Sequence, residues 1–314
     1  MTRQLWNAVV APHLEYGAEA IMLKAGDSRD LDTCQSKLLR AALGAPMASP
    51  LECMRWDLGI LPVTARRALR ALWWYGQLCM ILDSEPTRLL ARLAPYLDDE
   101  LSDLVKDLNL AWIPFETDMH TWKRSCRVAV TKWQRDTDAQ RLACMSSTAL
   151  FRDLYAPETP SGCQPYLLDS PLLGAASKMM FALRSAVAPL NATLYRQGQI
   201  RSPNCSLCGK GPEDTAHFML HCASLADLRA LMWRSLSTAG LQFLLGMPSS
   251  LLLALLLGKR TVDDFLGRNS YTLIDWHAKS YILAAAQHRA RTLGWKETCL
   301  WGLAGGLAHR DHDS

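Results

Sequence analysis

The chain has 314 residues, of which 49% are hydrophobic and 20% are charged, and its net charge is +4. These values are typical of a globular protein with enough chain for about two domains, and they exclude an intrinsically disordered chain. The mildly basic charge permits a nucleic-acid partner without requiring one. Ten cysteines are too sparse for a disulfide scaffold, so we expect free thiols in a reducing, intracellular compartment.

Neither secretion nor membrane insertion is expected. The N-terminal sequence MTRQLWNAVVAPHLEYG lacks the apolar core of a signal peptide. The most apolar run, Leu251 to Gly258, is less than half the length needed to span a bilayer. We therefore predict that this run is a buried helix, and that the protein acts in the nucleus or the cytoplasm.

Apolar residues recur at three- and four-residue spacing along most of the chain, which predicts an all-α fold. The first helix is expected over residues 3–24, broken or kinked near Pro12. The second is expected over 30–43 and stops at Gly44. Its predicted inward side chains are Leu31, Leu38, Leu39 and Ala42. A third helix begins at Pro62, because proline suits a first helical turn.

Further helical blocks are expected at 86–110 and 116–145, and the proline-rich stretch that follows them interrupts the helical pattern. We therefore divide the chain into a helical region over 1–82, a helical connector with a basic helix over 83–155, a proline-rich linker over 156–171, a helix over 172–200, a Cys/His segment over 201–228 and a helical C-terminal region over 229–314.

Three of the ten cysteines fall within CSLCGKGPEDTAHFMLHC, in the spacing Cys205-x2-Cys208-x8-His217-x4-Cys222. A Cys-x-x-Cys turn presents two thiolates from one tight loop. His217 and Cys222 are five residues apart, close to one helical turn, so both can face the same ion. Three thiolates and one imidazole complete a tetrahedral Zn²⁺ shell with no open position, which is typical of a structural site. We predict one structural zinc ion.

The alternative is that these are ordinary buried cysteines beside a surface histidine. The local density of cysteines argues against it, because the other seven are scattered singly along the chain. His221 is a competing ligand for His217. We prefer His217, because a ligand adjacent to Cys222 would crowd the metal shell.

The stretch TWKRSCRVAVTKWQRDTDAQR, residues 121–141, is the best candidate for a nucleic-acid contact. On a helix its cations cover one broad face and its apolar residues the other. The cations are Lys123, Arg124, Arg127, Lys132 and Arg135, and the apolar residues are Trp122, Cys126, Ala129, Val130 and Trp133. A cationic face on an anchored helix suits phosphate contact, although a merely solvated helix has the same pattern.

Two more basic groups occur on predicted helices. Arg66, Arg67 and Arg70 cluster on one face of the third helix. Near the C-terminus, Trp295 is accompanied by Lys279, Arg289, Arg291 and Lys296. An amphipathic helix can carry this basic pattern by chance as easily as for ligand binding.

The Cys/His spacing resembles the zinc-binding segment near the C-terminus of non-LTR (LINE-type) retrotransposon reverse transcriptases. The likeness includes Glu213 and Asp214 before the histidine and Arg229 after the last cysteine. The N-terminal third is similar to the same family. NAVVAPHLEYGAEA resembles the segment that follows the catalytic palm, with matches at Pro12, Tyr16, Gly17 and Glu19. The next stretch resembles the thumb-like helices, with matches at Leu39, Arg40, Leu43, Gly44, Leu58, Gly59 and Pro62.

This resemblance covers residues 3–80 and 200–230 closely. It implies a thumb-like region over 1–82, a zinc knuckle over 201–228, and a position of Arg66, Arg67 and Arg70 near the primer–template path. It also implies an RNA or DNA partner within a retroelement ribonucleoprotein, and no small-molecule substrate. Only two residues precede Arg3, so the chain looks truncated relative to the family and lacks the palm.

Two Asp-Asp pairs could suggest a polymerase centre: YLDD at 96–99 and VDDF at 262–265. The first is flanked by leucines at helical spacing, and acidic residues at the start of a helix interact favourably with the helix dipole. It also lies after the Pro-x-x-x-Tyr-Gly segment, whereas the family's Tyr-x-Asp-Asp lies before it. We therefore expect no catalytic residues in this chain.

The function expected from the sequence is that of a non-catalytic, nucleic-acid-binding C-terminal fragment of such a reverse transcriptase, with a structural zinc site. The alternative is a degenerate or domesticated remnant in which zinc staples helices into a protein-interaction scaffold.

Overall fold

The computed structural model describes residues 10–16, 25–81, 108, 118–155, 162–168, 174–260 and 266–294. These residues are predominantly helical, and within them the only β-type pairing is an isolated bridge between Asn204 and Pro212. The all-α prediction is thus confirmed. The chain divides into two compact units: unit 1 comprises Met1–Leu38 and Ile60–Arg141, and unit 2 comprises Leu39–Gly59 and Leu142–Ser314.

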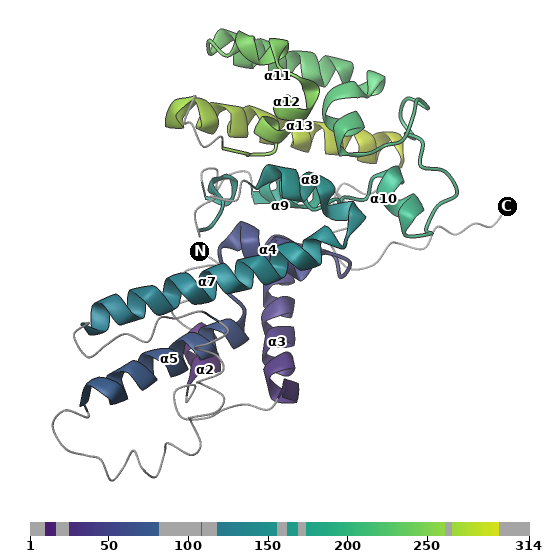
Figure 1. Cartoon of the computed structure of the whole chain (residues 1–314). Helices are drawn as coiled ribbons and strands as arrows, with labels where there is room; N and C mark the ends of the chain where they lie inside the picture. The colour runs from purple at the N-terminus through teal and green to yellow at the C-terminus, as the bar shows by residue number, and fades with distance from the viewer. Residues whose placement is uncertain are drawn as a thin grey trace. The chain divides into compact units, whose positions relative to one another are not determined.

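The helices are labelled in Figure 1. Unit 1 holds α2 (Ala11–Glu15), most of α3 (Ala25–Leu43), α5 (Val63–Ile81) and nearly all of α7 (Met119–Ala143). Unit 2 holds the end of α3 together with α4 (Leu51–Leu58), α8 (Ala149–Leu154), α9 (Gly174–Arg184), α10 (Asn191–Arg196), α11 (Ala226–Thr238), α12 (Ser249–Leu256) and α13 (Gly267–Thr292). Short 3-10 turns lie at Ser146–Thr148, Pro165–Leu167, Ala223–Leu225 and Gln242–Gly246, and a π turn lies at His217–His221.

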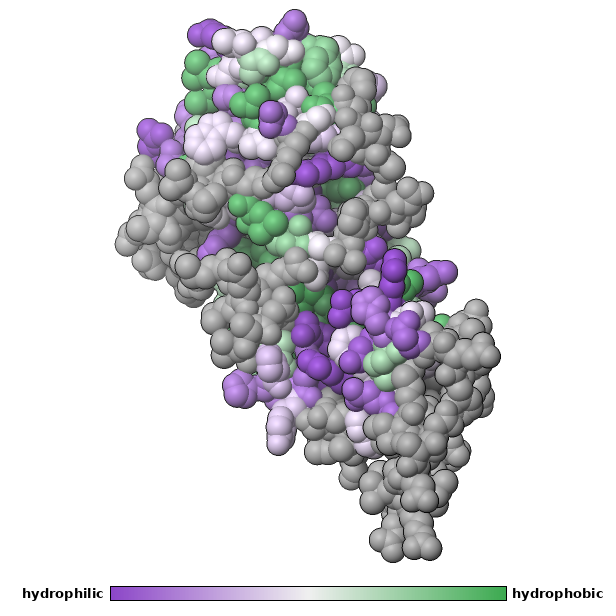
Figure 2. Space-filling view, turned by 90° about the vertical axis from the view of Figure 1, so that its left-hand side faces the viewer, coloured by the Kyte–Doolittle hydropathy of each residue, from purple (hydrophilic) through white to green (hydrophobic). Residues whose placement is uncertain are grey.

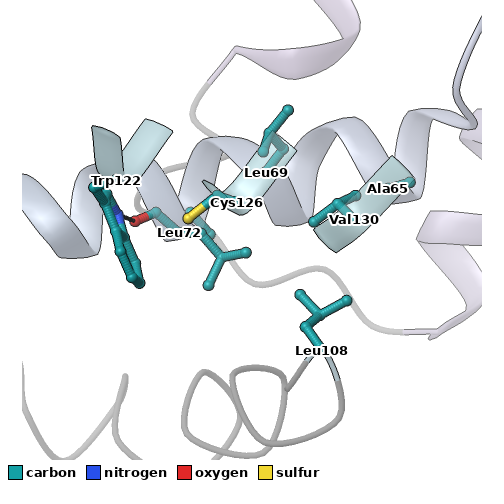
Figure 3. Packing of buried hydrophobic residues seen from close by; sticks show 8 residues of the cluster. Ala65, Leu69, Leu72, Leu108, Trp122, Cys126 and Val130 are labelled. Atoms are coloured by element: carbon teal, nitrogen blue, oxygen red, sulfur yellow. Dashed lines mark hydrogen bonds between the residues drawn. The ribbon is translucent and has the colours of Figure 1, made fainter. Parts of the chain in front are cut away.

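The core of unit 1 lies between α5 and α7 (Figure 3). The Trp122 indole N–H donates to the backbone oxygen of Leu72 at 2.8 Å, which satisfies the polar atom of a buried ring. Asp118 begins α7 as an N-cap, because its carboxylate accepts from the Thr121 backbone N–H at 2.9 Å. The buried residues of α7 follow a four-residue spacing: Trp122, Cys126, Val130, Gln134 and Asp138.

The prediction that Trp133 points inward is wrong. Trp133 is 42% exposed, and Gln134 is buried in its place. Residues spaced four apart move gradually around a helix of 3.6 residues per turn. By residue 133 the buried face has therefore rotated away from the side on which Trp133 lies. Gln134 tolerates burial because its amide donates to the Asp138 carboxylate at 2.8 Å.

Two further expectations in unit 1 need correction. The single helix over 3–24 is wrong, because α2 ends at Glu15 and Tyr16 has an extended ψ of 131°. Pro12 lies in the first turn of α2, where proline is tolerated. In α3, Leu38 is 41% exposed, while Gln35 is buried because its amide donates to the backbone oxygen of Leu61.

The stop of α3 and the burial of the leucine run are as predicted. Gly44 adopts φ +60°, a left-handed conformation that favours glycine at a helix end. In α12, Leu252 to Leu256 are buried. No helix among the described residues is both long enough and apolar enough to cross a membrane.

Unit 2 is built around α13, which packs against α9, α11 and α12. The helix predicted over 172–200 is two helices, α9 and α10, because the chain turns between them at Ala186, whose φ is +53°. Hydrophobic side chains remain exposed on α11 and α13, including Leu231, Leu273 and Trp276. Figure 2 shows hydrophobic groups at the surface at the height of α11.

A polar cluster is buried inside unit 2. The Arg184 guanidinium donates to both carboxylate oxygens of Asp57, at 3.0 and 3.2 Å, and the two side chains are at most 1% exposed. The hydroxyls of Tyr155 and Tyr166 donate to the same carboxylate. The described part of the expected proline-rich linker, residues 162–168, therefore contributes a core residue, since Tyr166 is 2% exposed.

We expect Gly59→Ala to lower the free energy of unfolding by about 2 kcal/mol or more. Gly59 has φ +62°, and an added Cβ would lie 2.3 Å from the backbone carbon of Gly162. Gly240→Ala is the matched control, because Gly240 has φ +80° but no neighbouring atom within 4 Å. Guanidinium unfolding should show the larger loss for Gly59→Ala. Equal losses would contradict the close packing of residue 162 on Gly59.

Candidate metal centre and basic helix

The loop of the Cys/His segment is closed by backbone hydrogen bonds. The Gly209 N–H donates to the Cys205 oxygen at 2.8 Å, and the Cys205 N–H donates to the Gly211 oxygen at 2.9 Å. Gly209 and Gly211 have φ values of +68° and +67°, which permit this tight reversal. As a result, Cys205 and Cys208 project from one short turn.

A π turn brings the other half of the cluster into place. The Cys222 N–H donates to the His217 oxygen at 2.7 Å, a five-residue step. In a regular α-helix two residues five apart would point in different directions, whereas a single π turn brings them to the same side. The turn begins where Asp214 accepts from the His217 backbone N–H at 2.7 Å. The expectation that His217 and Cys222 face one point is therefore met by a π turn.

The four side chains predicted as ligands converge. Cys205, Cys208, His217 and Cys222 each offer a ligand atom, and these atoms all lie within 4.8 Å of one another. The Cys205 and Cys222 sulfurs are 3.8 Å apart, and the Cys208 sulfur is 3.4 Å from His217 Nε2. His221 is exposed and lies outside this group. The group could hold a metal ion, with all four positions filled by protein atoms.

The thiols differ in their acidity. Burial raises the pKa of Cys205 to about 12 and also raises that of Cys222. Burial opposes ionisation of Cys208 as well, but the Lys210 backbone N–H and the neighbouring thiols outweigh it and lower the pKa of Cys208. Burial lowers the pKa of His217, which favours the neutral imidazole that a metal needs. A bound cation would displace the thiol protons, so metal binding releases protons.

The Cys/His segment packs directly on α11 and α13 of unit 2. Arg229 of α11 donates to the Cys222 oxygen at 2.7 Å, and the Tyr281 hydroxyl of α13 donates to the Phe218 oxygen at 2.6 Å. Phe218 is 1% exposed and its ring lies 6.2 Å from that of Tyr281. Phe218 is thus a core residue, as its place between the ligands suggests for so small a segment.

The basic face predicted on α7 is present, although its cations differ in their contacts. Arg124, Arg127 and Lys132 are exposed, while Lys123 and Arg135 are partly buried.

Three predicted cations from two helices meet at one ring. Arg70 of α5 and Lys123 and Arg127 of α7 each lie 5.4–5.8 Å from the ring centre of Trp73. The Trp73 indole N–H donates to the backbone oxygen of Lys123 at 3.3 Å, which holds the ring between α5 and α7. Sequence spacing did not identify Trp73, because the two helices that form its surroundings are about 50 residues apart.

The second predicted group, on α5, has a structural role as well. Arg66 and Arg70 pair with Glu15 of α2, whose side chain is 5% exposed. Arg67 donates to the Leu14 backbone oxygen at 3.1 Å. These three arginines therefore anchor α2 on α5, and Arg70 also reaches the ring of Trp73.

The C-terminal basic group is mostly internal. Lys279 pairs with Asp275 and Arg289 pairs with Glu213, and both cations are at most 3% exposed. Arg291 is exposed, and Trp295 and Lys296 lie outside the described residues. The YLDD and VDDF motifs, at 96–99 and 262–265, lie outside them too.

Comparison of the chain with known proteins returns no match to a family model, to a curated protein or to a solved structure.

Proposed function

We propose that the chain binds RNA or DNA through α7 and the adjoining part of α5, and that a structural zinc ion holds the Cys/His segment in unit 2. In this proposal it has no catalytic centre of its own and corresponds to the C-terminal region of a non-LTR retrotransposon reverse transcriptase. Its expected setting is an intracellular ribonucleoprotein.

Zinc is supported by the spacing of the ligand atoms. Zinc–sulfur and zinc–nitrogen bonds of about 2.3 and 2.05 Å in a tetrahedron give sulfur–sulfur edges of about 3.8 Å and sulfur–nitrogen edges of about 3.6 Å. The Cys205–Cys222 sulfur distance is 3.8 Å, and the Cys208 sulfur is 3.4 Å from His217 Nε2. A shell of three thiolates and one imidazole with no open position favours a structural ion.

Nucleic-acid binding is supported above all by the meeting of Arg70, Lys123 and Arg127 around Trp73. A face that gathers cations attracts anions from solution. The ring contacts leave the charges of Lys123 and Arg127 in place, while Arg70 also pairs with Glu15. Arg124 and Lys132 extend the same charge along α7 as exposed side chains. A polyanion is the ligand that such an extended cationic face suits.

The alternative, a zinc-stapled interaction scaffold, is favoured by a different observation. Arg66, Arg67 and Arg70 hold α2 in place, and the Cys/His segment is fixed to α13 through Tyr281. In a scaffold these arginines would serve only to hold the helices together. The two functions differ in what salt and charge reversal should do.

We expect binding of a single-stranded oligonucleotide to weaken with salt. If Lys123, Arg124, Arg127, Lys132 and Arg135 each contact a phosphate, the logarithm of the affinity falls against the logarithm of salt concentration with a slope of about −3.5, at about 0.7 per contact. The double variant Arg124→Glu/Arg127→Glu should reduce the magnitude of this slope to about 2 or below. It should weaken the binding of all oligonucleotide sequences equally, because phosphate contacts carry no base information. Fluorescence anisotropy across a salt series measures both.

The matched control is Arg152→Glu/Arg234→Glu, which makes the same change in net charge at two exposed arginines of unit 2. It should leave the slope unchanged. Equal behaviour of the two double variants, or an affinity no tighter than that of a generic basic peptide, would favour the scaffold.

A further inference from the structure

Glu213 is a buried carboxylate beside the candidate metal centre, and its ion-pair partner comes from outside the Cys/His segment. It is 1% exposed, and one of its oxygens lies 3.8 Å from the Cys205 sulfur. Arg289 of α13 donates to both carboxylate oxygens, at 2.8 and 2.9 Å. This two-point contact is the strongest form of an arginine–carboxylate pair. Arg289 is itself 3% exposed, so the pair is shielded from water.

Asn191 connects this ion pair to the loop that carries Cys205. Its backbone N–H donates to Glu213 at 2.9 Å, and Arg289 reaches its side-chain oxygen at 3.4 Å. Its side-chain nitrogen donates to the Asn204 backbone oxygen at 2.5 Å and to the Ser206 hydroxyl at 2.7 Å. The residues immediately before and after Cys205 are therefore both held by Asn191.

The charges of the loaded centre require a cation at this place. A divalent ion with three thiolates and a neutral imidazole has a net charge of −1, and Glu213 adds another negative charge 3.8 Å from Cys205. Arg289 offsets this repulsion at short range, and Arg229 adds a second positive charge against the Cys222 oxygen at 2.7 Å. Without Arg289 the buried Glu213 carboxylate would face the Cys205 thiolate with its charge uncompensated.

We propose that Arg289 is a positioning residue for the metal centre: through Glu213 and Asn191 it fixes the Cys205 loop, and it compensates the charge of the loaded site. Since Arg289 belongs to α13, metal binding and the docking of α13 are coupled, and each stabilises the other to the same extent. The inference rests on the proposed zinc centre. Groups outside the ligand shell of metal sites commonly change metal affinity by 10- to 100-fold.

The test measures zinc affinity of the full chain by competition with a chromogenic chelator. Arg289→Met should weaken zinc binding by about 10- to 100-fold. Arg289→Lys should recover part of the loss, because a single positive charge returns without the two-point contact. Arg289→Met/Glu213→Gln should bind more tightly than Arg289→Met, because the uncompensated carboxylate is gone. Arg291→Met is the matched control, an exposed arginine on the same helix, and should bind as the unaltered chain does.

Two spectroscopic and exchange measurements separate positioning from general damage. With saturating Co²⁺, Arg289→Met should keep the absorption of a tetrahedral thiolate site, because all four ligands remain. In the unaltered chain, chelation of zinc should reduce the hydrogen-exchange protection of α13 amides around Arg289. Should Arg289→Met fail to fold, Arg289→Lys and Glu213→Gln carry the affinity test.

Zinc affinity of Arg289→Met equal to that of Arg291→Met, or α13 protection unchanged by chelation, would overturn the coupling and leave the zinc centre standing. An unaltered chain that binds no zinc would overturn the centre itself.

Discussion

Arg184→Met is expected to lower the free energy of unfolding by about 3–5 kcal/mol, because it leaves the Asp57 carboxylate buried without its counter-charge. Asp57 is fully buried, and Arg184 supplies two of the hydrogen bonds to it. The remaining donors, the hydroxyls of Tyr155 and Tyr166, are neutral. Arg184 also donates to the Leu257 backbone oxygen, which would lose its donor. Guanidinium unfolding followed by circular dichroism measures the loss.

Two comparisons sharpen this result. Asp57→Leu/Arg184→Met should be more stable than Arg184→Met alone, because removing both charges avoids an unpaired buried ion. Arg152→Met, at an exposed arginine of α8, should change stability by no more than about 0.5 kcal/mol. If Arg184→Met and Arg152→Met unfold at the same guanidinium concentration, the ion pair does not stabilise unit 2.

The local features of this fold could be predicted from sequence. Helical spacing predicted the all-α class and located α5 and α7 to within a few residues. The glycine at position 44 predicted the end of α3, and its left-handed backbone agrees with that prediction. The Cys/His group was found because its four candidate ligands lie within eighteen residues, so a short loop and one helical turn suffice to bring them together.

The features that depend on distant partners could not be predicted. Asp57 and Arg184 are separated by 127 residues, and Glu213 and Arg289 by 76, so no spacing rule links them. Trp133 was predicted inward because the sequence pattern did not show how far the buried face moves around α7 along its length. Arg289 was grouped with the other C-terminal cations, because the sequence shows its charge but not the buried Glu213 carboxylate that pairs with it.

Removal of zinc is expected to unfold the Cys/His segment and to destabilise unit 2. The free energy of binding at structural zinc sites is about 10–16 kcal/mol at neutral pH, and it contributes directly to folding. The segment buries Phe218, Met219 and Leu225 against the rest of unit 2, and the Tyr281 hydroxyl bonds the Phe218 backbone. Loss of the metal should therefore disturb α13 as well as the loop.

Native mass spectrometry should find one zinc ion per chain, and Cys208→Ser should lose it. Cys144→Ser, at an exposed cysteine outside the group, should retain it. Zinc binding should weaken as the pH falls, because protons compete with the metal for the thiolates and the imidazole. Since burial raises the pKa of Cys205 to about 12, that proton is displaced only by the metal at neutral pH. A metal-free chain with unchanged amide protection over residues 203–224 would contradict a structural zinc ion, because the loop would then hold its shape by hydrogen bonds alone.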